Sequence, residues 1–160
     1  MKLTYYTDYS LRVLIFVAVH ADEPVTIQRI ADAYGLPKNH LIKIVQRLGQ
    51  LGHLRTTRGR AGGLRLGRPV AEINVGEVVR AMEPDFDMVE CFQAGNRCSI
   101  TPVCGLKGVL NQALVAYFQV LNQYTLKDLI PDAAAAHRLL NPNEHLLLPT
   151  PRQALGTSTE

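Results

Sequence analysis

The hydrophobic residues in the first third of the chain recur with the period of a helix in three successive segments. In the first segment Thr7 or Asp8 is the expected N-cap, and apolar side chains follow every three or four residues. These apolar positions are Leu11, Leu14, Ile15, Ala18 and Val19. The second segment starts after Thr26 and stops at Gly35, residue types that suit an N-cap and a left-handed C-cap. Pro37 opens the third segment, as a first-turn proline does.

The third predicted helix is amphipathic. Its apolar side consists of Leu41, Ile44, Val45, Leu48 and Leu51, and its polar side of Asn39, His40, Lys43, Gln46, Arg47 and Gln50. Two short helices joined by a glycine-bearing turn, the second of them basic, predict a helix-turn-helix. The residues expected to read bases are Asn39, His40 and Lys43. Those expected to contact phosphates are Thr26, Gln28 and Arg47. For His40, a phosphate contact or an idle surface position is the alternative.

A two-stranded wing is predicted directly after the third helix. Residues 53–57 and 64–66 suit two strands, and the segment between them is rich in glycine and arginine. Glycines allow a close approach to DNA, and Arg58 or Arg60 at this tip could enter a narrow minor groove. An ordinary hairpin whose arginines serve solubility is the alternative.

Charge is distributed unevenly along the chain, although the formal net charge is only +3. No Asp or Glu occurs between Asp32 and Glu72, so residues 33–71 carry +8 and the remainder carries 9 − 14 = −5. A basic stretch of this kind favours binding to nucleic-acid phosphates. A solvated surface with chance clustering of charge is the alternative.

The second half of the chain predicts a further helix over residues 73–82, a loop over residues 83–104 and a long helix over residues 105–124. One apolar row of the long helix forms a heptad seam, made of Leu106, Leu110, Ala113, Tyr117, Val120 and Tyr124. A second row consists of Val109, Leu114, Phe118 and Leu121. We expect the first helix of the same chain to cover one row and a second copy of the long helix to cover the other. A core formed within one chain is the alternative.

These elements give a mainly α fold with a small β wing, in which a winged helix-turn-helix domain is followed by a long dimerisation helix. The expected division is a DNA-binding domain at 1–83, a cluster-binding loop at 84–104, a dimerisation helix with a short following helix at 105–130, and a C-terminal extension at 131–160 that is largely disordered at its end. The motifs of phosphate loops, nucleophile elbows and zinc hydrolases are missing, so we do not expect an enzyme. A protein-interaction module that does not bind DNA is a further alternative.

Three cysteines, Cys91, Cys98 and Cys104, lie in the predicted loop, separated by six and five residues. An odd count argues against a disulfide scaffold, and the apolar residues 13–21 are too few to span a bilayer. We therefore expect a cytoplasmic, reducing location in which clustered thiols bind metal. The spacing is too wide for paired zinc knuckles and suits an iron-sulfur cluster that needs a fourth ligand. The candidates for that ligand are Asp85, Asp87, Glu90, His137 and Asp8 of the partner subunit. Inert or zinc-binding thiols are the alternative.

The chain resembles the Rrf-two family of bacterial iron-sulfur regulators in three places. These are residues 6–12 (YTDYSLR), the wing at residues 58–66 (RGRAGGLRL), and the three cysteines ahead of a long helix. Residues 83–92 (EPDFDMVECF) and 124–129 (YTLKDL) most resemble the branch of nitric-oxide-sensitive repressors. The resemblance covers about residues 1–130.

The resemblance implies a homodimer, an inverted-repeat operator on double-stranded DNA, and a 4Fe-4S cluster whose nitrosylation releases the operator; a 2Fe-2S cluster is the alternative. The implied ligands are Cys91, Cys98, Cys104 and Asp8 of the partner subunit. A histidine usually follows the last cysteine by three residues in the relative that senses cluster supply, whereas this chain has Lys107 there. That difference favours the nitric-oxide branch, and an iron-responsive or cluster-status regulator remains the alternative.

Overall fold

The computed structural model describes residues 2–57, 59 and 62–141. Its α-helices are α1 (Tyr5–Val19), α2 (Ile27–Tyr34), α3 (Lys38–Gln50), α4 (Val75–Met82), α5 (Leu106–Leu121) and α6 (Ala133–Leu140). Two short 3-10 helices are η1 (Val70–Glu72) and η2 (Glu90–Phe92), and the strands are β1 (Leu54–Thr57) and β2 (Gly63–Leu66). This order confirms the predicted mainly helical fold with a β wing.

The helix-turn-helix is built around α1, whose buried residues form its centre. Val13, Leu14 and Phe16 have no exposed surface, and they belong to one core with the apolar sides of α3 and α4. Gly35 ends α2 in the left-handed conformation at a φ of 62°, as predicted. The wing is antiparallel, with Leu54 opposite Leu66. The core therefore fixes how α3 and the wing are presented together.

The start of α1 differs from the prediction. Thr4 is the N-cap, and its side chain accepts a hydrogen bond from the backbone N–H of Thr7. Thr7 is itself fully buried, and Asp8 lies in the first turn of the helix. The prediction that Thr7 or Asp8 caps α1 was wrong because the helix begins at Tyr5, more than two turns ahead of Val13, its first buried apolar residue.

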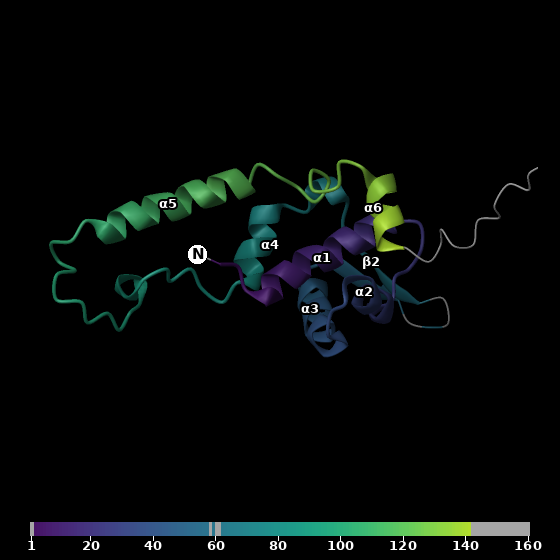
Figure 1. Cartoon of the computed structure of the whole chain (residues 1–160), viewed down its shortest axis with the longest axis horizontal. Helices are drawn as coiled ribbons and strands as arrows, with labels where there is room; N and C mark the ends of the chain where they lie inside the picture. Colours follow the sequence, from purple (N-terminus) through teal and green to yellow (C-terminus); the bar gives the residue numbers. More distant parts are fainter. Residues whose placement is uncertain (1, 58, 60–61, 142–160) are drawn as a thin grey trace, which may run out of the picture.

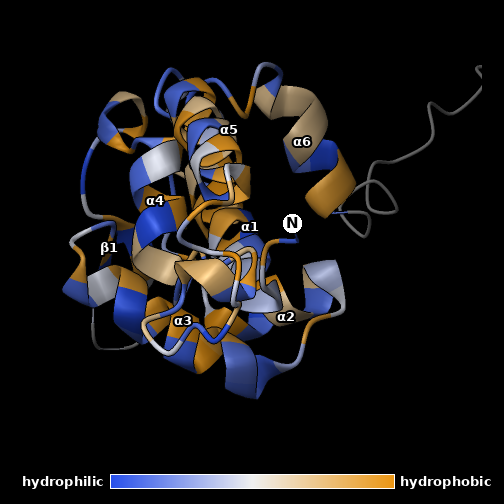
Figure 2. Cartoon of the chain, turned by 90° about the vertical axis from the view of Figure 1, so that its left-hand side faces the viewer, coloured by the Kyte–Doolittle hydropathy of each residue, from blue (hydrophilic) through white to orange (hydrophobic). Residues whose placement is uncertain are grey.

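Helix α5 runs outward from the body of the protein, and the loop from α4 follows it to its far end (Figure 1). Phe118 packs with Val75 and Val79 of α4, and Leu114 and Leu121 lie against the same cluster. The partner within the chain was expected to be α1, whereas this row packs mainly on α4, with Leu11 of α1 at its edge. The helix ends at Leu121, three residues earlier than predicted, and carries further hydrophobic residues along its length (Figure 2).

Helix α6 was not predicted. Residues 122–130 form turns, so the short helix expected there is missing from this described segment and the next helix starts at Ala133. Asp132 caps α6, and Asn141 at its end contacts His20 of α1 at 2.7 Å and accepts a hydrogen bond from Arg29 of α2 at 3.0 Å. The C-terminal extension is therefore attached to the helix-turn-helix. The predicted disorder at the end of the chain concerns residues outside the described ones.

No helix among the described residues has the length and apolar character needed to cross a membrane.

Candidate DNA-binding surface and cysteine loop

The outer side of α3 is exposed and carries the residues predicted to read DNA. Asn39, His40, Lys43 and Arg47 are all exposed, whereas the apolar side of the helix is buried. In Figure 1, α3 lies on the side of α1 opposite α5. Neither the side chain of Asn39 nor that of Lys43 or Arg47 forms an ion pair or hydrogen bond among the described residues. This side of α3 can therefore approach DNA without first breaking an internal contact.

The first turn of α1 contacts α3 close to these residues. The ring of Tyr5 stacks on the ring of His40, with centroids 5.1 Å apart and planes inclined by 30°. The Tyr6 hydroxyl donates a hydrogen bond to the backbone carbonyl of Lys43 at 3.2 Å. Sequence reasoning missed Tyr5, because only a long-range contact shows that it belongs beside the third helix.

The residues of α2 that were expected to contact phosphates have structural contacts of their own. The Thr26 side chain caps α2 by accepting from the backbone N–H of Arg29. The Gln28 amide donates to Asp32 at 2.8 Å. Arg29 forms an ion pair with Glu23, and this contact is the main cause of the lowered pKa of Glu23. Thr26 remains exposed, so its cap does not prevent a further contact with phosphate.

Two arginines of the basic stretch hold the wing in place. Arg65 donates to the backbone carbonyls of Ala21 and Asp22, and Arg68 donates to that of Leu51 at 3.0 Å. Their role is structural, which the charge count alone could not reveal. Gly59 at the wing tip has a φ of 111°, a conformation that favours glycine. Arg58 and Arg60, predicted to enter the minor groove, lie outside the described residues.

The three cysteines lie on the loop between α4 and α5 and form no disulfide. Cys91 and Cys104 are half-buried and Cys98 is exposed. Neighbouring polar groups order the loop: Glu90 accepts from the backbone N–H of Arg97, and Asn96 accepts from that of Cys98 at 3.0 Å. Within the described part of the chain, no three His, Cys, Asp or Glu side chains lie close enough together to hold a metal ion. The donor types suit an iron-sulfur cluster, whereas a single chain does not gather them into a site.

Asp8 lies in α1 and is paired with Arg12 one turn later. The Arg12 guanidinium reaches both carboxylate oxygens, at 3.0 Å and 2.8 Å. Both side chains are about two-fifths exposed, at 42% and 44%. An ion pair this exposed contributes little to stability, so Asp8 can leave Arg12 for another partner at a small cost in free energy. Of the other candidate ligands, Asp85 accepts from the backbone N–H of Asp87. The ring of His137 in α6 lies against that of His20 at the end of α1, with centroids 4.7 Å apart and planes tilted by 40°.

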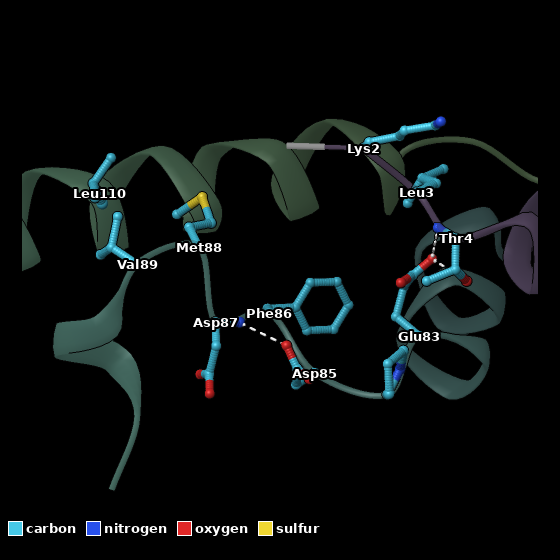
Figure 3. Close-up of a pocket in the computed structure, with 11 residues that line it drawn as sticks. Lys2, Leu3, Thr4, Glu83, Asp85, Phe86, Asp87, Met88, Val89 and Leu110 are labelled. Atoms are coloured by element: carbon cyan, nitrogen blue, oxygen red, sulfur yellow. Dashed lines mark hydrogen bonds between the residues drawn. The ribbon is translucent and has the colours of Figure 1, made fainter. Parts of the chain in front are cut away.

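A cleft of about 510 Å³ separates the N-terminal residues from the beginning of the cysteine loop. Figure 3 shows Phe86 inside it, with Met88 and Val89 below α5. At one end, the carboxylate of Glu83 accepts from the backbone N–H of Thr4 at 2.8 Å and from its hydroxyl at 3.1 Å. Glu83, at the start of the cysteine loop, is therefore hydrogen-bonded to Thr4, the N-cap of α1.

Comparison with known proteins identifies the family to which this chain belongs. The Rrf2 family, described as iron-dependent transcriptional regulators, matches residues 3–132, which is most of the chain. The chain belongs to the Rrf2 family. The resemblance seen in the sequence is thus confirmed, and the protein is a transcriptional regulator rather than an enzyme.

Relatives within the Rrf2 family define the match further. The HTH-type transcriptional regulator NsrR of Bacillus subtilis is 56% identical over 146 residues, covering 90% of this chain and all of that protein. The protein of the same name from Geobacillus kaustophilus is 49% identical, with 88% and 97% covered. Among solved structures, IscR of T. potens superposes with a TM-score of 0.68 at 26% identity, covering 85% of this chain and 90% of that one. These relatives confirm the winged-helix fold and the NsrR branch.

Proposed function

We propose that this Rrf2-family regulator is a DNA-binding repressor that releases its operator when nitric oxide reacts with an iron-sulfur cluster held by its cysteine loop. The observation that carries the proposal is the position of three free thiols on one loop between the DNA-reading domain and α5. The identity to regulators named NsrR supports the role in transcription. The nitric-oxide signal is proposed from the resemblance of residues 83–92 and 124–129 to the branch of nitric-oxide-sensitive repressors.

The proposed ligands are Cys91, Cys98, Cys104 and Asp8 of the partner subunit. When bound, the cluster would offer one iron with a weakly held carboxylate, a more accessible position for a small ligand than an iron bound by four thiolates. Asp8 would leave Arg12 to bind this iron, and because the ion pair is exposed, breaking it would cost little free energy.

A homodimer is proposed because α5 keeps an uncovered apolar side. Its exposed hydrophobic residues are Leu106, Val109, Val115 and Val120, with exposed fractions between 49% and 63%. A helix that is hydrophobic on more than one side needs a second partner, and a second copy of α5 supplies one of the same chemistry. A two-fold dimer presents two copies of α3, which require an inverted-repeat operator with half-sites about 34 Å apart or a multiple of that distance.

Each subunit would read DNA through α3 and the wing. Asn39, His40 and Lys43 would face base edges in the major groove, since residues near the start of a recognition helix do so. Thr26, Gln28 and Arg47 would contact phosphates, with Gln28 giving up its hydrogen bond to Asp32. Arg58 and Arg60 of the wing would enter the minor groove.

The first experiment is the visible spectrum of the full-length protein, purified without oxygen and titrated with nitric oxide. Iron-sulfur absorption that bleaches on addition of the gas, together with loss of DNA binding, is the expected result. Absorption that does not respond to nitric oxide would replace this proposal with iron or cluster-supply sensing. A colourless protein, prepared with iron and sulfide present, would instead favour a thiol- or zinc-responsive regulator.

A matched pair of variants tests the thiol ligands. Cys98→Ser should lose the iron-sulfur absorption, because a hydroxyl is a poor substitute for a thiolate. Ser99→Ala, at the exposed neighbouring position, should keep it. Equal iron and sulfide content in both variants would rule out Cys98 as a ligand.

The carboxylate ligand is tested by Asp8→Ala, with Asp22→Ala as an exposed acidic control. The Asp8 variant should bind the operator whether or not nitric oxide is added, or fail to bind it in both conditions, because its cluster no longer bridges the subunits. The Asp22 variant should respond like the wild type. A normal nitric-oxide response in Asp8→Ala would count against the bridge.

A further inference from the structure

Tyr5 is the most exposed aromatic residue that touches the proposed DNA-reading side of α3. It belongs to α1, outside the helix-turn-helix motif, and 57% of its surface is exposed. Its described ring contacts are the stack on His40 and a tilted contact with Tyr9 at 5.7 Å. A tyrosine that is so exposed adds little to the core, so the contact with His40 is its distinguishing feature.

The stack restricts His40 and leaves its polar edge available. An exposed histidine on a helix samples several rotamers, and fixing such a side chain on binding weakens association. Stacking on Tyr5 limits this freedom before DNA arrives. The ring nitrogens of His40 hydrogen bond to no other described residue, so they remain available to a base edge.

Tyr5 is itself held firmly. Thr4, the preceding residue, caps α1 and is fastened to Glu83 by two hydrogen bonds, at 2.8 Å and 3.1 Å. Tyr6, the following residue, is bonded to the backbone of Lys43. The backbone on both sides of Tyr5 is therefore held in place, which keeps its ring beside His40.

We propose that Tyr5 is a positioning residue for DNA recognition, which holds the His40 imidazole in the orientation that reads one base pair of each half-site. This inference rests on the proposed DNA-reading role of α3. It predicts that Tyr5 determines sequence selectivity at that base pair and adds little to the affinity for phosphates.

The test uses the full-length protein and a duplex that the wild type selects from a randomised library. Binding to this duplex and to each of its single-base-pair variants is measured for the wild type, His40→Ala, Tyr5→Ala and Tyr5→Phe. A wrong base pair typically weakens binding about tenfold or more. At the base pair that His40→Ala identifies, Tyr5→Ala should reduce this discrimination at least threefold, whereas Tyr5→Phe, which keeps the ring, should retain it.

Two further measurements separate positioning from a general structural effect. The slope of affinity against salt should be unchanged in Tyr5→Ala, because no phosphate contact is lost. Tyr5→Ala should have no further effect in the His40→Ala background, since the two residues act as one unit. Tyr5→Leu provides a second variant that fills similar space without a ring able to stack, and it should behave like Tyr5→Ala.

The outcomes are distinguishable. A wild type that selects no duplex refutes the proposed function, and this inference with it. If the wild type selects a duplex and Tyr5→Ala discriminates as well as the wild type, the proposed function stands and the inference is refuted. Uniform weakening across all base pairs, or unchanged discrimination in His40→Ala, also overturns it.

Discussion

The crossing of α4 and α5 leaves no room for a side chain at Gly76, so Gly76→Ala should destabilise the protein. A Cβ at this position would lie 2.1 Å from the Asn122 side-chain oxygen and 3.2 Å from the Asn122 backbone nitrogen. Real Cβ contacts essentially never fall below 3.0 Å, so the oxygen must move by 3.0 − 2.1 = 0.9 Å. The oxygen also accepts a hydrogen bond from Arg80 at 2.9 Å, and moving it strains that bond.

The size of the effect follows from three contributions. Forcing an extra methyl group into a tight contact costs about 1–3 kcal/mol. Loss of an exposed hydrogen bond costs about 0.5–1.5 kcal/mol. Alanine offsets these by at most about 1 kcal/mol, because it favours a helix more than glycine does. With the full offset from alanine, the free energy of unfolding should therefore fall by about 0.5–3.5 kcal/mol.

The assay is urea unfolding at one fixed protein concentration, because association would shift the midpoint. A loss of about 2 kcal/mol, the middle of this range, should lower the midpoint by about 1 M at a slope of about 2 kcal/mol per M. Gly49→Ala is the matched control, since a Cβ there would meet no described atom nearer than 4.0 Å. That variant should be slightly more stable than the wild type. Stabilisation by Gly76→Ala as well would refute the steric argument.

Three further predictions use other contacts. Asn74→Ala should cost about 1–2 kcal/mol in urea unfolding, because Asn74 caps α4 and also donates to the Asn122 carbonyl at 2.8 Å; a loss below about 0.5 kcal/mol would contradict it. Arg47→Ala should make the slope of log affinity for DNA against log salt concentration shallower by about 0.9, the value for one phosphate contact. Arg65→Ala, which removes a wing contact, should leave that slope unchanged. His53 is buried, and desolvation lowers its pKa below the ordinary value of 6.5. The unfolded chain therefore binds the proton more readily, and stability should fall as pH decreases from about 7. His53→Gln should lose less stability over the same range, and equal losses would exclude His53 as the cause.

The sequence predicted the elements whose signals are local. Gly35 and Thr26 bound α2 as expected, since each acts within one turn of the helix. The wing followed from two short strands around a glycine-rich tip. For α1, three neighbouring polar residues could each have capped the helix, and only packing identifies Thr4 as the cap.

Features that depend on contacts between residues distant in the sequence could not be predicted from the sequence pattern. The apolar rows of α5 predicted two partners, and the choice of α4 over α1 depended on close contact at Gly76, which the pattern does not encode. Helix α6 is short and was missed, although Asp132 before four alanines was an available signal for it. The proposed cysteine site would take ligands from two chains, so neither the sequence pattern nor the geometry of a single chain assembles it.

The attachment of α6 bears on where this protein can be shortened. The family match stops at residue 132, and α6 begins at Ala133, so a boundary drawn from family similarity would remove the helix. Such a truncation would take Asn141 from the buried His20 and from Arg29, and would leave a polar ring uncovered at the end of α1. The family model therefore covers less of the chain than the unit that folds here, whereas the B. subtilis relative aligns with 90% of the chain, and expression fragments should extend through Asn141.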